Sequence, residues 1–279
     1  MPLARGQLAF DLVDSLSEPS FAPSTLVVIG GGSLIDRAKR WRRDHAPAAH
    51  LVAVPSLWGS GADASPVAVF TVGERKVIEM SDALRPDARS TWPDLADLVP
   101  PAAACAGYGD TWSHALEGFF SPLASTELRT RLAAFIKGPL LDAPLERDPA
   151  WFDLSAQACA FQAGSGVGLV HGVAHRLEAG SGRSHAQWCS LMLWPVMRFN
   201  FATSTKVREL VTAYALPWTR IDARIRELHE PAAYDAAVAS LREQWNAILR
   251  EPLTRINPAL VRPDSLAYFE ERRFDESAA

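Results

Sequence analysis

The sequence predicts an α/β domain of residues 1–100 followed by an all-helical domain of residues 101–279. Two observations lead to this prediction. In the first hundred residues, short apolar runs alternate with turns, which is typical of a parallel sheet built from βαβ units. After the paired prolines Pro100 and Pro101, the β-branched runs stop and apolar residues recur at helical spacing. We place the boundary between residues 98 and 104.

The apolar runs at residues 24–32, 49–56 and 65–72 predict three buried strands. The segment SLIDRAKRWRRDH between the first two has helical periodicity, so it completes a βαβ unit with a parallel sheet. The chain end EERRFDESAA is expected to fray. The segments with the clearest helical periodicity beyond the boundary are DTWSHALEGFF, ELRTRLAAFIKGPLL and PAAYDAAVASLREQWNAIL.

Composition and charge exclude several classes of partner. A net charge of -4 offers no electrostatic attraction to nucleic acid or to an anionic membrane. The chain has neither a signal-peptide pattern nor a run of about twenty apolar residues, so we expect a cytoplasmic protein. The three cysteines form no C-x-x-C pair, so neither a disulfide framework nor a thiolate metal site is expected; they are Cys105, Cys159 and Cys189.

Two glycine-rich turns follow the first two predicted strands. The first, GGGS at residues 30–33, leads into a helix, where free N–H groups and the positive end of the helix dipole favour an anion. It matches neither the standard dinucleotide motif nor a P-loop, so a purely structural turn is the alternative. The second is PSLWGSGADAS at residues 55–65. Because adjacent parallel strands end at one edge of a sheet, the two turns together predict a dinucleotide site.

Four of the seven histidines and one aspartate favour a metal site. Asp110 and His114 are four residues apart and share a helix face, as do His171 and His175. His185 follows ten residues later, after a glycine-rich loop. A carboxylate and several imidazoles form a donor set for Fe(II), Zn(II) or another divalent transition metal. The alternative for any single pair is a hydrogen-bonded core or surface histidine.

Taken together and in order, these motifs resemble the iron-containing (group III) alcohol dehydrogenases, which are related to the dehydroquinate synthase fold. The resemblance covers roughly residues 24–202. It implies a metal-dependent oxidoreductase, linked to NAD or NADP, that transfers hydride between an alcohol carbon and the nicotinamide. The matching segments are GGGSLIDRAK, PSLWGSGAD, LVPP, GYGDTWSHALEGF, GVGLVHGVAHRLEA, SHA and LWPVMRFN.

The resemblance also implies a role for each site residue. His175 would lie beside the reacting carbon and the nicotinamide and relay a proton. One divalent metal ion, Fe²⁺ or Zn²⁺, would be bound by Asp110, His114, His171 and His185. The dinucleotide would be held by Gly31, Gly32, Ser33, Asp36, Ser56, Leu57, Ser60 and Lys76.

The chain departs from the family pattern at its N-terminal side. The family has two more strands and a helix before the glycine turn, including an aspartate that contacts the adenosine ribose. Here the first predicted strand begins at residue 24, so we expect a truncated parallel sheet and a shortened lobe, and the choice between NAD and NADP is not readable. Arg176 and Ala186 replace a usual proline and glycine, and Asp63 stands near a usual glutamate, but no predicted metal ligand is lost.

A shortened lobe exposes a sheet edge and opens the interdomain cleft. We therefore expect a partner protein or a second subunit of a homo-oligomer to cover the edge, and the cleft to admit a bulky substrate such as a peptide terminus. Short members of the family resemble the dehydrogenases of daptide-type ribosomal peptide (RiPP) biosynthesis. Those enzymes oxidise a C-terminal threonine, and decarboxylation then gives an aminoketone. The alternatives are a dehydrogenase or reductase of a small alcohol or aldehyde, and a non-catalytic scaffold, against which the intact donor set argues.

Overall fold

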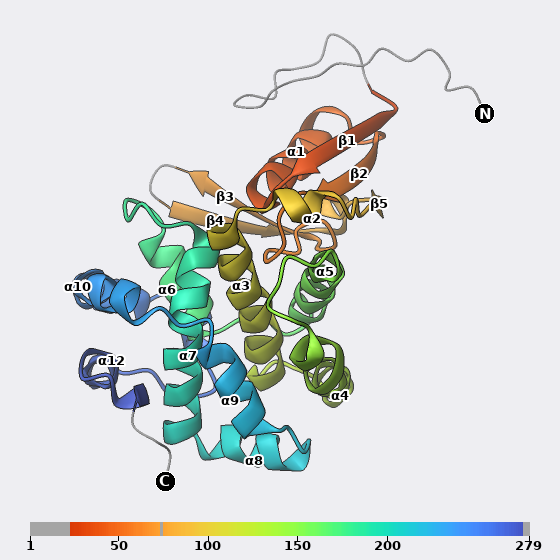
Figure 1. Ribbon diagram of the computed structural model, residues 1–279. Helices are drawn as coiled ribbons and strands as arrows, with labels where there is room; N and C mark the ends of the chain where they lie inside the picture. The colour runs from red at the N-terminus through yellow and green to blue at the C-terminus, as the bar shows by residue number, and fades with distance from the viewer. Residues whose placement is uncertain (1–22, 73–74, 276–279) are drawn as a thin grey trace.

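The computed structural model describes residues 23–72 and 75–275, with side chains described outside residues 71–76. A sheet-containing part stands at one end of a group of packed helices (Figure 1). The described strands all precede residue 90, and from residue 95 onward the described chain is helical or irregular. The predicted order of an α/β region followed by a helical region is confirmed.

The parallel sheet is small. Strands β1 (Thr25–Gly30) and β2 (His50–Pro55) pair in parallel, and β2 pairs in parallel with the two-residue strand β5 (Ala88–Arg89). Helix α1 (Gly32–His45) connects β1 to β2 and packs on one face of the sheet, which confirms the predicted βαβ unit. The expectation that the first strand is fully buried is wrong, because Val27 and Ile29 are 53% and 45% exposed.

The third predicted strand exists, but it does not belong to the parallel sheet. Strand β3 (Val67–Val72) pairs antiparallel with β4 (Arg75–Met80) in a separate hairpin. Two residues separate these strands, and so short a connection allows only antiparallel pairing. The hairpin is held on α1, where the ammonium group of Lys39 donates to the carbonyl of Val67 at 2.7 Å and to the carboxylate of Asp36 at 2.9 Å.

Helix α3 (Pro101–Phe120) is the centre of the helical part, and every residue from Ala106 to Phe120 is buried. It packs against α5 (Ala150–Gln162) and α7 (His185–Thr203), and α6 (Leu169–Leu177) packs on α7 (Figure 1). Among residues 23–72 and 75–275, no helix is long and apolar enough to cross a membrane.

Most of the remaining helices complete the hydrophobic core around α3 and α7. The three segments with the clearest helical periodicity are confirmed as helices. The first lies in α3, the second covers α4 and the π-helix that follows it, and the third covers α10. The helices are α2 (Leu95–Leu98), α4 (Thr126–Phe135), the π-helix Ile136–Leu140, α8 (Thr205–Ala213), α9 (Trp218–Arg226), α10 (Pro231–Ile248), α11 (Pro252–Arg255) and α12 (Leu266–Glu270), with 3-10 turns at Asp82–Leu84, Pro263–Ser265 and Arg273–Asp275.

The expectation of a frayed chain end is wrong for one residue of that segment. Phe274 is fully buried, with its ring 5.4 Å from that of Trp194 and 5.0 Å from that of Tyr234. Burying an aromatic side chain outweighs the cost of ordering the few residues that carry it. The last four residues, 276–279, lie outside the described part of the chain.

Candidate metal and cofactor site

Helix α3 supplies Asp110 and His114, and glycines let it approach its neighbours closely. A Cβ atom at Gly109 would lie 2.4 Å from Ser190 of α7. A Cβ atom at Gly107 would lie 2.5 Å from the ring of Trp58. Because both positions lack a side chain, the turn of α3 that carries the carboxylate lies directly against α7 and the second glycine-rich turn.

Helices α6 and α7 bring the remaining histidines to the same place. His171 and His175 lie on α6. Gly172 allows this helix to pack closely against Thr254, because a Cβ atom at position 172 would lie only 2.4 Å from the Thr254 hydroxyl. His185 is the first residue of α7, whose N-terminus is fixed by a capping box between the side chains and backbone of Ser184 and Gln187. The cap therefore fixes where the His185 ring enters the site.

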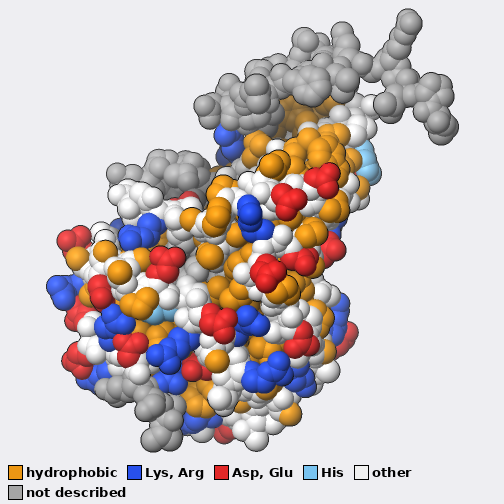
Figure 2. Space-filling view, in the orientation of Figure 1, with side chains coloured by type: hydrophobic (Ala, Val, Ile, Leu, Met, Phe, Trp, Pro, Cys, Tyr) orange, Lys and Arg blue, Asp and Glu red, His pale blue; other side chains and the backbone are white. Residues whose placement is uncertain are grey.

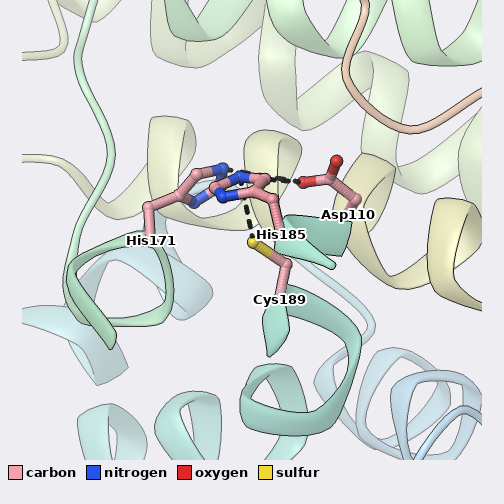
Figure 3. Close-up of side chains that lie close together, drawn as sticks. All are labelled: Asp110, His171, His185 and Cys189. Carbon is pink, nitrogen blue, oxygen red and sulfur yellow. Dashed lines mark hydrogen bonds and ion pairs between the residues drawn. The ribbon is translucent and has the colours of Figure 1, made fainter. Parts of the chain in front are cut away.

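The structure brings the four predicted metal ligands close together, but His114 is not among the residues whose ligand atoms all lie within 4.8 Å of one another. The Oδ1 atom of Asp110 lies 3.7 Å from His114 Nδ1, 3.7 Å from His171 Nε2 and 4.0 Å from His185 Nε2. The Nε2 atoms of His114 and His171 are 3.2 Å apart. Figure 3 shows the rings of His171 and His185 turned toward the Asp110 carboxylate. Side chains separated by up to 75 residues in sequence thus converge on one point.

Sequence reasoning missed Cys189, which the structure adds to this group. Its Sγ lies 3.4 Å from His185 Nε2 (Figure 3). One ligand atom from each of Asp110, His171, His185 and Cys189 lies within 4.8 Å of the others. The absence of a C-x-x-C pair argued against a thiolate, but the spacing of four residues between His185 and Cys189 on one helix was a usable signal.

Burial dominates the electrostatics of the group. Burial raises the pKa of Asp110, whereas the charge of His114 and a hydrogen bond from Cys189 lower it. Burial also lowers the pKa of His171 well below its usual value, together with repulsion from His114 and His175. Burial and the carboxylates of Asp110 and Glu117 raise the pKa of the Cys189 thiol well above its usual range. Without a bound cation, the protein therefore favours the neutral form of each of these three groups.

Two buried polar atoms in the group lack the hydrogen bonds that buried polar atoms normally make. Within the described residues, neither Oδ1 of Asp110 nor Nδ1 of His114 has a hydrogen-bond partner. Leaving such atoms unsatisfied in the interior is costly. A divalent cation would satisfy them, and one carboxylate with three imidazoles is a suitable donor set for Fe²⁺ or Zn²⁺. The residues present therefore fit a metal ion.

Glu117, to which sequence reasoning assigned no role, orients His171. Its Oε2 lies 2.7 Å from His171 Nδ1, and its Oε1 accepts a hydrogen bond from the backbone N–H of Val170 at 2.7 Å. Burial raises the pKa of Glu117 to about 7, although hydrogen bonds from backbone N–H groups, including that of Gly168, lower it. An ionised Glu117 accepts a hydrogen bond from Nδ1–H of His171, which keeps the proton on Nδ1 and leaves the lone pair of Nε2 directed at the group.

A cavity of about 500 Å³ joins the metal group to the first glycine turn. Its size is within the usual range of small-molecule sites. Gly31 and Ser56 do not line it, and the side chain of Lys76 lies outside the described residues. The predicted site residues that line it are Gly32, Ser33, Asp36, Leu57, Ser60, Asp110, His114, His171, His175 and His185.

The two glycine-rich turns contact each other and the metal group. A Cβ atom at Gly32 would lie 2.3 Å from the hydroxyl of Ser60, and one at Gly59 would lie 3.2 Å from Oδ2 of Asp110. Gly59 has a φ of +117°, and its N–H donates to the hydroxyl of Ser155 at 2.8 Å. The two glycine-rich turns and the carboxylate and histidine group thus line one cavity.

The start of α1 is suited to an anion, whereas Asp36 already has partners. The helix begins at Gly32 without a side-chain cap and without an acidic residue in its first turn. The positive end of its dipole therefore faces the cavity at Gly32 and Ser33. Asp36 accepts from Lys39 at one oxygen and from the N–H of Val69 at the other, at 2.9 Å each, so it also holds the hairpin.

Comparisons with known proteins point to one family. No family model matches the chain. The 1-propanol dehydrogenase of Salmonella typhimurium is 29% identical over 192 residues, which are 64% of this chain and 52% of that protein. The chain spans about half the length of the first curated relatives it matches. Part of the chain therefore has a named alcohol dehydrogenase as a relative.

Solved structures show the fold. The sulfoacetaldehyde reductase of Bifidobacterium kashiwanohense, solved with NAD⁺, matches with a TM-score of 0.70 at 20% identity, covering 91% of this chain and 77% of that one. The iron-containing alcohol dehydrogenase of Corynebacterium glutamicum matches with a TM-score of 0.67 at 21% identity, covering 89% and 72%. The fold is that of the iron-containing alcohol dehydrogenases.

Proposed function

We propose that this protein is a metal-dependent, NAD(P)-linked oxidoreductase that interconverts an alcohol and a carbonyl compound by hydride transfer. One observation carries the proposal: the buried carboxylate and histidine group opens into the cavity that reaches the N-terminus of α1. A relative named as an alcohol dehydrogenase and a similar structure solved with NAD⁺ support it. In this proposal residues 1–100 form the dinucleotide-binding domain and residues 101–279 the metal-binding domain.

The proposed metal ligands are Asp110, His114, His171 and His185. A bound divalent ion supplies Lewis-acid chemistry at the substrate oxygen. Glu117 keeps the proton of His171 on Nδ1, so that Nε2 presents its lone pair. The apolar surroundings of α3 exclude water from the back of the group, which strengthens electrostatic interactions within it. The chain thus supplies both the donors and their orientation.

His175 is the proposed proton relay. It is half-buried and lines the cavity, and its ring centroid lies 5.1 Å from that of His185 and 6.4 Å from that of His171. A histidine between a buried group and an open cavity is placed to pass a proton between the substrate hydroxyl and water. Its partial exposure keeps that path open.

The proposed dinucleotide site lies at the other end of the cavity. The N–H groups of Gly32 and Ser33 at the start of α1 would hold the pyrophosphate. Gly31, as the N-cap residue of α1, sets the direction in which these groups point. The rest of the proposed set is Asp36, Ser56, Leu57, Ser60 and Lys76.

Two substrate classes follow from the proposal. The names of the relatives support a small alcohol or aldehyde. The second class is a peptide with a C-terminal threonine. Its β-carbon would give a hydride to NAD⁺, and its β-hydroxyl would give a proton to His175 and on to water. The resulting β-keto acid would then lose CO₂. Exposed apolar side chains around the cavity support a ligand of that size, since Leu57, Ile78 and Met80 are 38%, 46% and 63% exposed.

The experiment is an assay of the purified, metal-loaded protein. Its NADH-binding fluorescence, its metal content and its turnover of 1-propanol, propanal and a threonine-ended peptide are measured in parallel. A peptide ending in valine, which lacks the hydroxyl, is the matched control. Oxidative decarboxylation removes roughly 46 Da, H₂ plus CO₂, from the threonine peptide alone. A protein that binds neither metal nor dinucleotide would instead support the scaffold alternative.

We also propose that a partner protein or a second subunit covers strand β1. Among the described strands, β1 pairs on one side only, and its exposed Val27 and Ile29 are unusual for a sheet of this kind. Figure 2 shows many hydrophobic side chains over the sheet-containing part and charged ones over the helical part. Sedimentation of the wild type beside Val27→Lys tests this, because a charge in a buried interface would dissociate the assembly.

A further inference from the structure

The described part of the chain holds three thiols, and one of them lies among the proposed metal ligands. Cys189 is fully buried on α7, one helical turn after His185. Its Sγ is 3.4 Å from His185 Nε2. Its other neighbours in the group are Asp110 and His171, whose ligand atoms lie within 4.8 Å of it. Figure 3 shows the sulfur directed at the space between these side chains rather than away from them.

We propose, on the basis of the proposed metal site, that Cys189 is itself a metal ligand and that its sulfur makes zinc preferred over iron(II). Nothing in the resemblance to the alcohol dehydrogenases implies this, because the ligand set carried over from that family contains one aspartate and three histidines.

The spacing of the atoms suits a shared ion. Zinc lies about 2.3 Å from sulfur and about 2.0 to 2.1 Å from nitrogen, so two such ligands on one tetrahedral ion lie roughly 3.5 Å apart. The 3.4 Å between Cys189 Sγ and His185 Nε2 agrees with this value. Asp110 Oδ1, at 4.0 Å from the same nitrogen and without a hydrogen-bond partner in the described residues, supplies the oxygen donor.

The type of donor bears on which metal is held. A set of nitrogen and oxygen atoms accepts iron(II) and zinc alike, and geometry or supply then decides between them. Thiolate is a softer donor and is typical of zinc sites. A tetrahedral ion takes four ligands, so Cys189 would join Asp110, His171 and His185 in the place first assigned to His114. This change moves the site toward zinc, and toward cobalt(II) as its spectroscopic substitute.

Cys159 offers an internal comparison. It is also buried, lines the same cavity from α5 and has a pKa raised to about 12, chiefly by burial. It lies against the second glycine turn, where a Cβ atom at Gly61 would meet its Cβ at 2.3 Å, and it is not a member of the metal group. Burial alone thus does not distinguish the two thiols, but their positions do.

The test is the absorption spectrum of the cobalt(II)-loaded protein. A cobalt–thiolate bond gives an intense charge-transfer band in the near ultraviolet, which cobalt bound only by nitrogen and oxygen lacks. We expect the band in the wild type and in Cys159→Ala and its loss in Cys189→Ala. Competition between zinc and iron(II), followed by metal content, should show a zinc preference that falls on the order of 10-fold or more in Cys189→Ser.

The possible outcomes separate the inference from the proposed function. A wild type that binds one cobalt ion without the band, or a band that persists in Cys189→Ala, would overturn the inference and leave the metal site intact. A wild type that binds no cobalt would overturn both. The wild-type spectrum decides the matter even if a Cys189 variant does not fold, and Cys189→Ser keeps nearly the volume of the thiol.

Discussion

The two ends of the candidate site are built in different ways. At the metal end, side chains from α3, α6 and α7 converge within a densely packed core, and Asp110 is 1% exposed. At the proposed cofactor end, backbone turns meet through glycines, and the exposed side chains of Leu57 and Met80 line the cavity. The first end depends on the chemistry of a few side chains, and the second on the absence of side chains.

This difference teaches how each end fails. Removing a donor at the metal end changes ligand binding while the surrounding core holds the remaining donors in place. Adding a single methyl group at the cofactor end forces two turns apart, because there is no free volume between Gly32 and Ser60. Variants at the two ends should therefore separate metal binding from dinucleotide binding.

The largest effect is expected from Asp110→Asn, which keeps the shape of the side chain but removes its charge. Metal affinity should fall by more than about 100-fold, since even partners of metal ligands contribute about 10- to 100-fold. Turnover should fall roughly 10³-fold, because Lewis-acid assistance contributes several kcal/mol. Metal content and kcat are the measurements, with the exposed Asp142→Asn as control. A metal-replete, active Asp110→Asn protein would contradict the proposed site.

The next effect is on the pH dependence of stability in the metal-free protein. Burial raises the pKa of Glu117 from 4.5 to about 7. Between these values the folded protein binds more protons than the unfolded chain, so stability falls as the pH rises through this window. His171, with its lowered pKa, acts in the opposite direction, so the contribution of Glu117 is obtained by difference.

That difference is measured by urea denaturation of wild type and Glu117→Gln, both treated with a chelator, at pH 5 and pH 7. Relative to the variant, the wild type should lose roughly 2 kcal/mol of stability between the two pH values. Equal pH slopes for the two proteins would show that Glu117 ionises as it does in water, contrary to its burial.

In the metal-loaded protein, Glu117→Gln should lower metal affinity by about 10- to 100-fold without loss of fold. If the amide oxygen accepts the N–H of Val170, the amide nitrogen donates to Nδ1 of His171. The ring proton then moves to Nε2 and blocks the lone pair that the metal requires. Zinc competition with a chelating dye measures the change, and Glu117→Asp shows whether a shorter carboxylate restores part of it.

The smallest of these effects is expected at the cofactor end. Gly32→Ala should weaken NADH binding by about 10-fold and leave metal content unchanged, because the added methyl group displaces Ser60. The double variant Gly32→Ala with Ser60→Gly should recover most of the affinity. Gly138→Ala is the control, since a Cβ atom there meets no described atom within 4 Å. Equal NADH affinity in Gly32→Ala and wild type would place the dinucleotide elsewhere.

The sequence was informative where the feature is local. The spacing of Asp110 and His114, and of His171 and His175, followed from helical periodicity, and the glycine turn at Gly32 followed from its place between a strand and a helix. The predicted third strand was also correct as a strand. Its expected place in the parallel sheet was wrong, because the two-residue connection to β4 imposes antiparallel pairing whatever the hydrophobicity of the strand.

The sequence by itself determined the alternation of strands and helices and the types of donor atoms, because periodicity and side-chain chemistry are properties of short segments. Only the tertiary structure decided which donors meet. Cys189 joined the group because close packing of α3 on α7 at Gly109 brings α7 to the carboxylate, and Glu117 became a partner of His171 across two helices. Such contacts depend on how whole helices pack, and no local pattern in the chain encodes that packing.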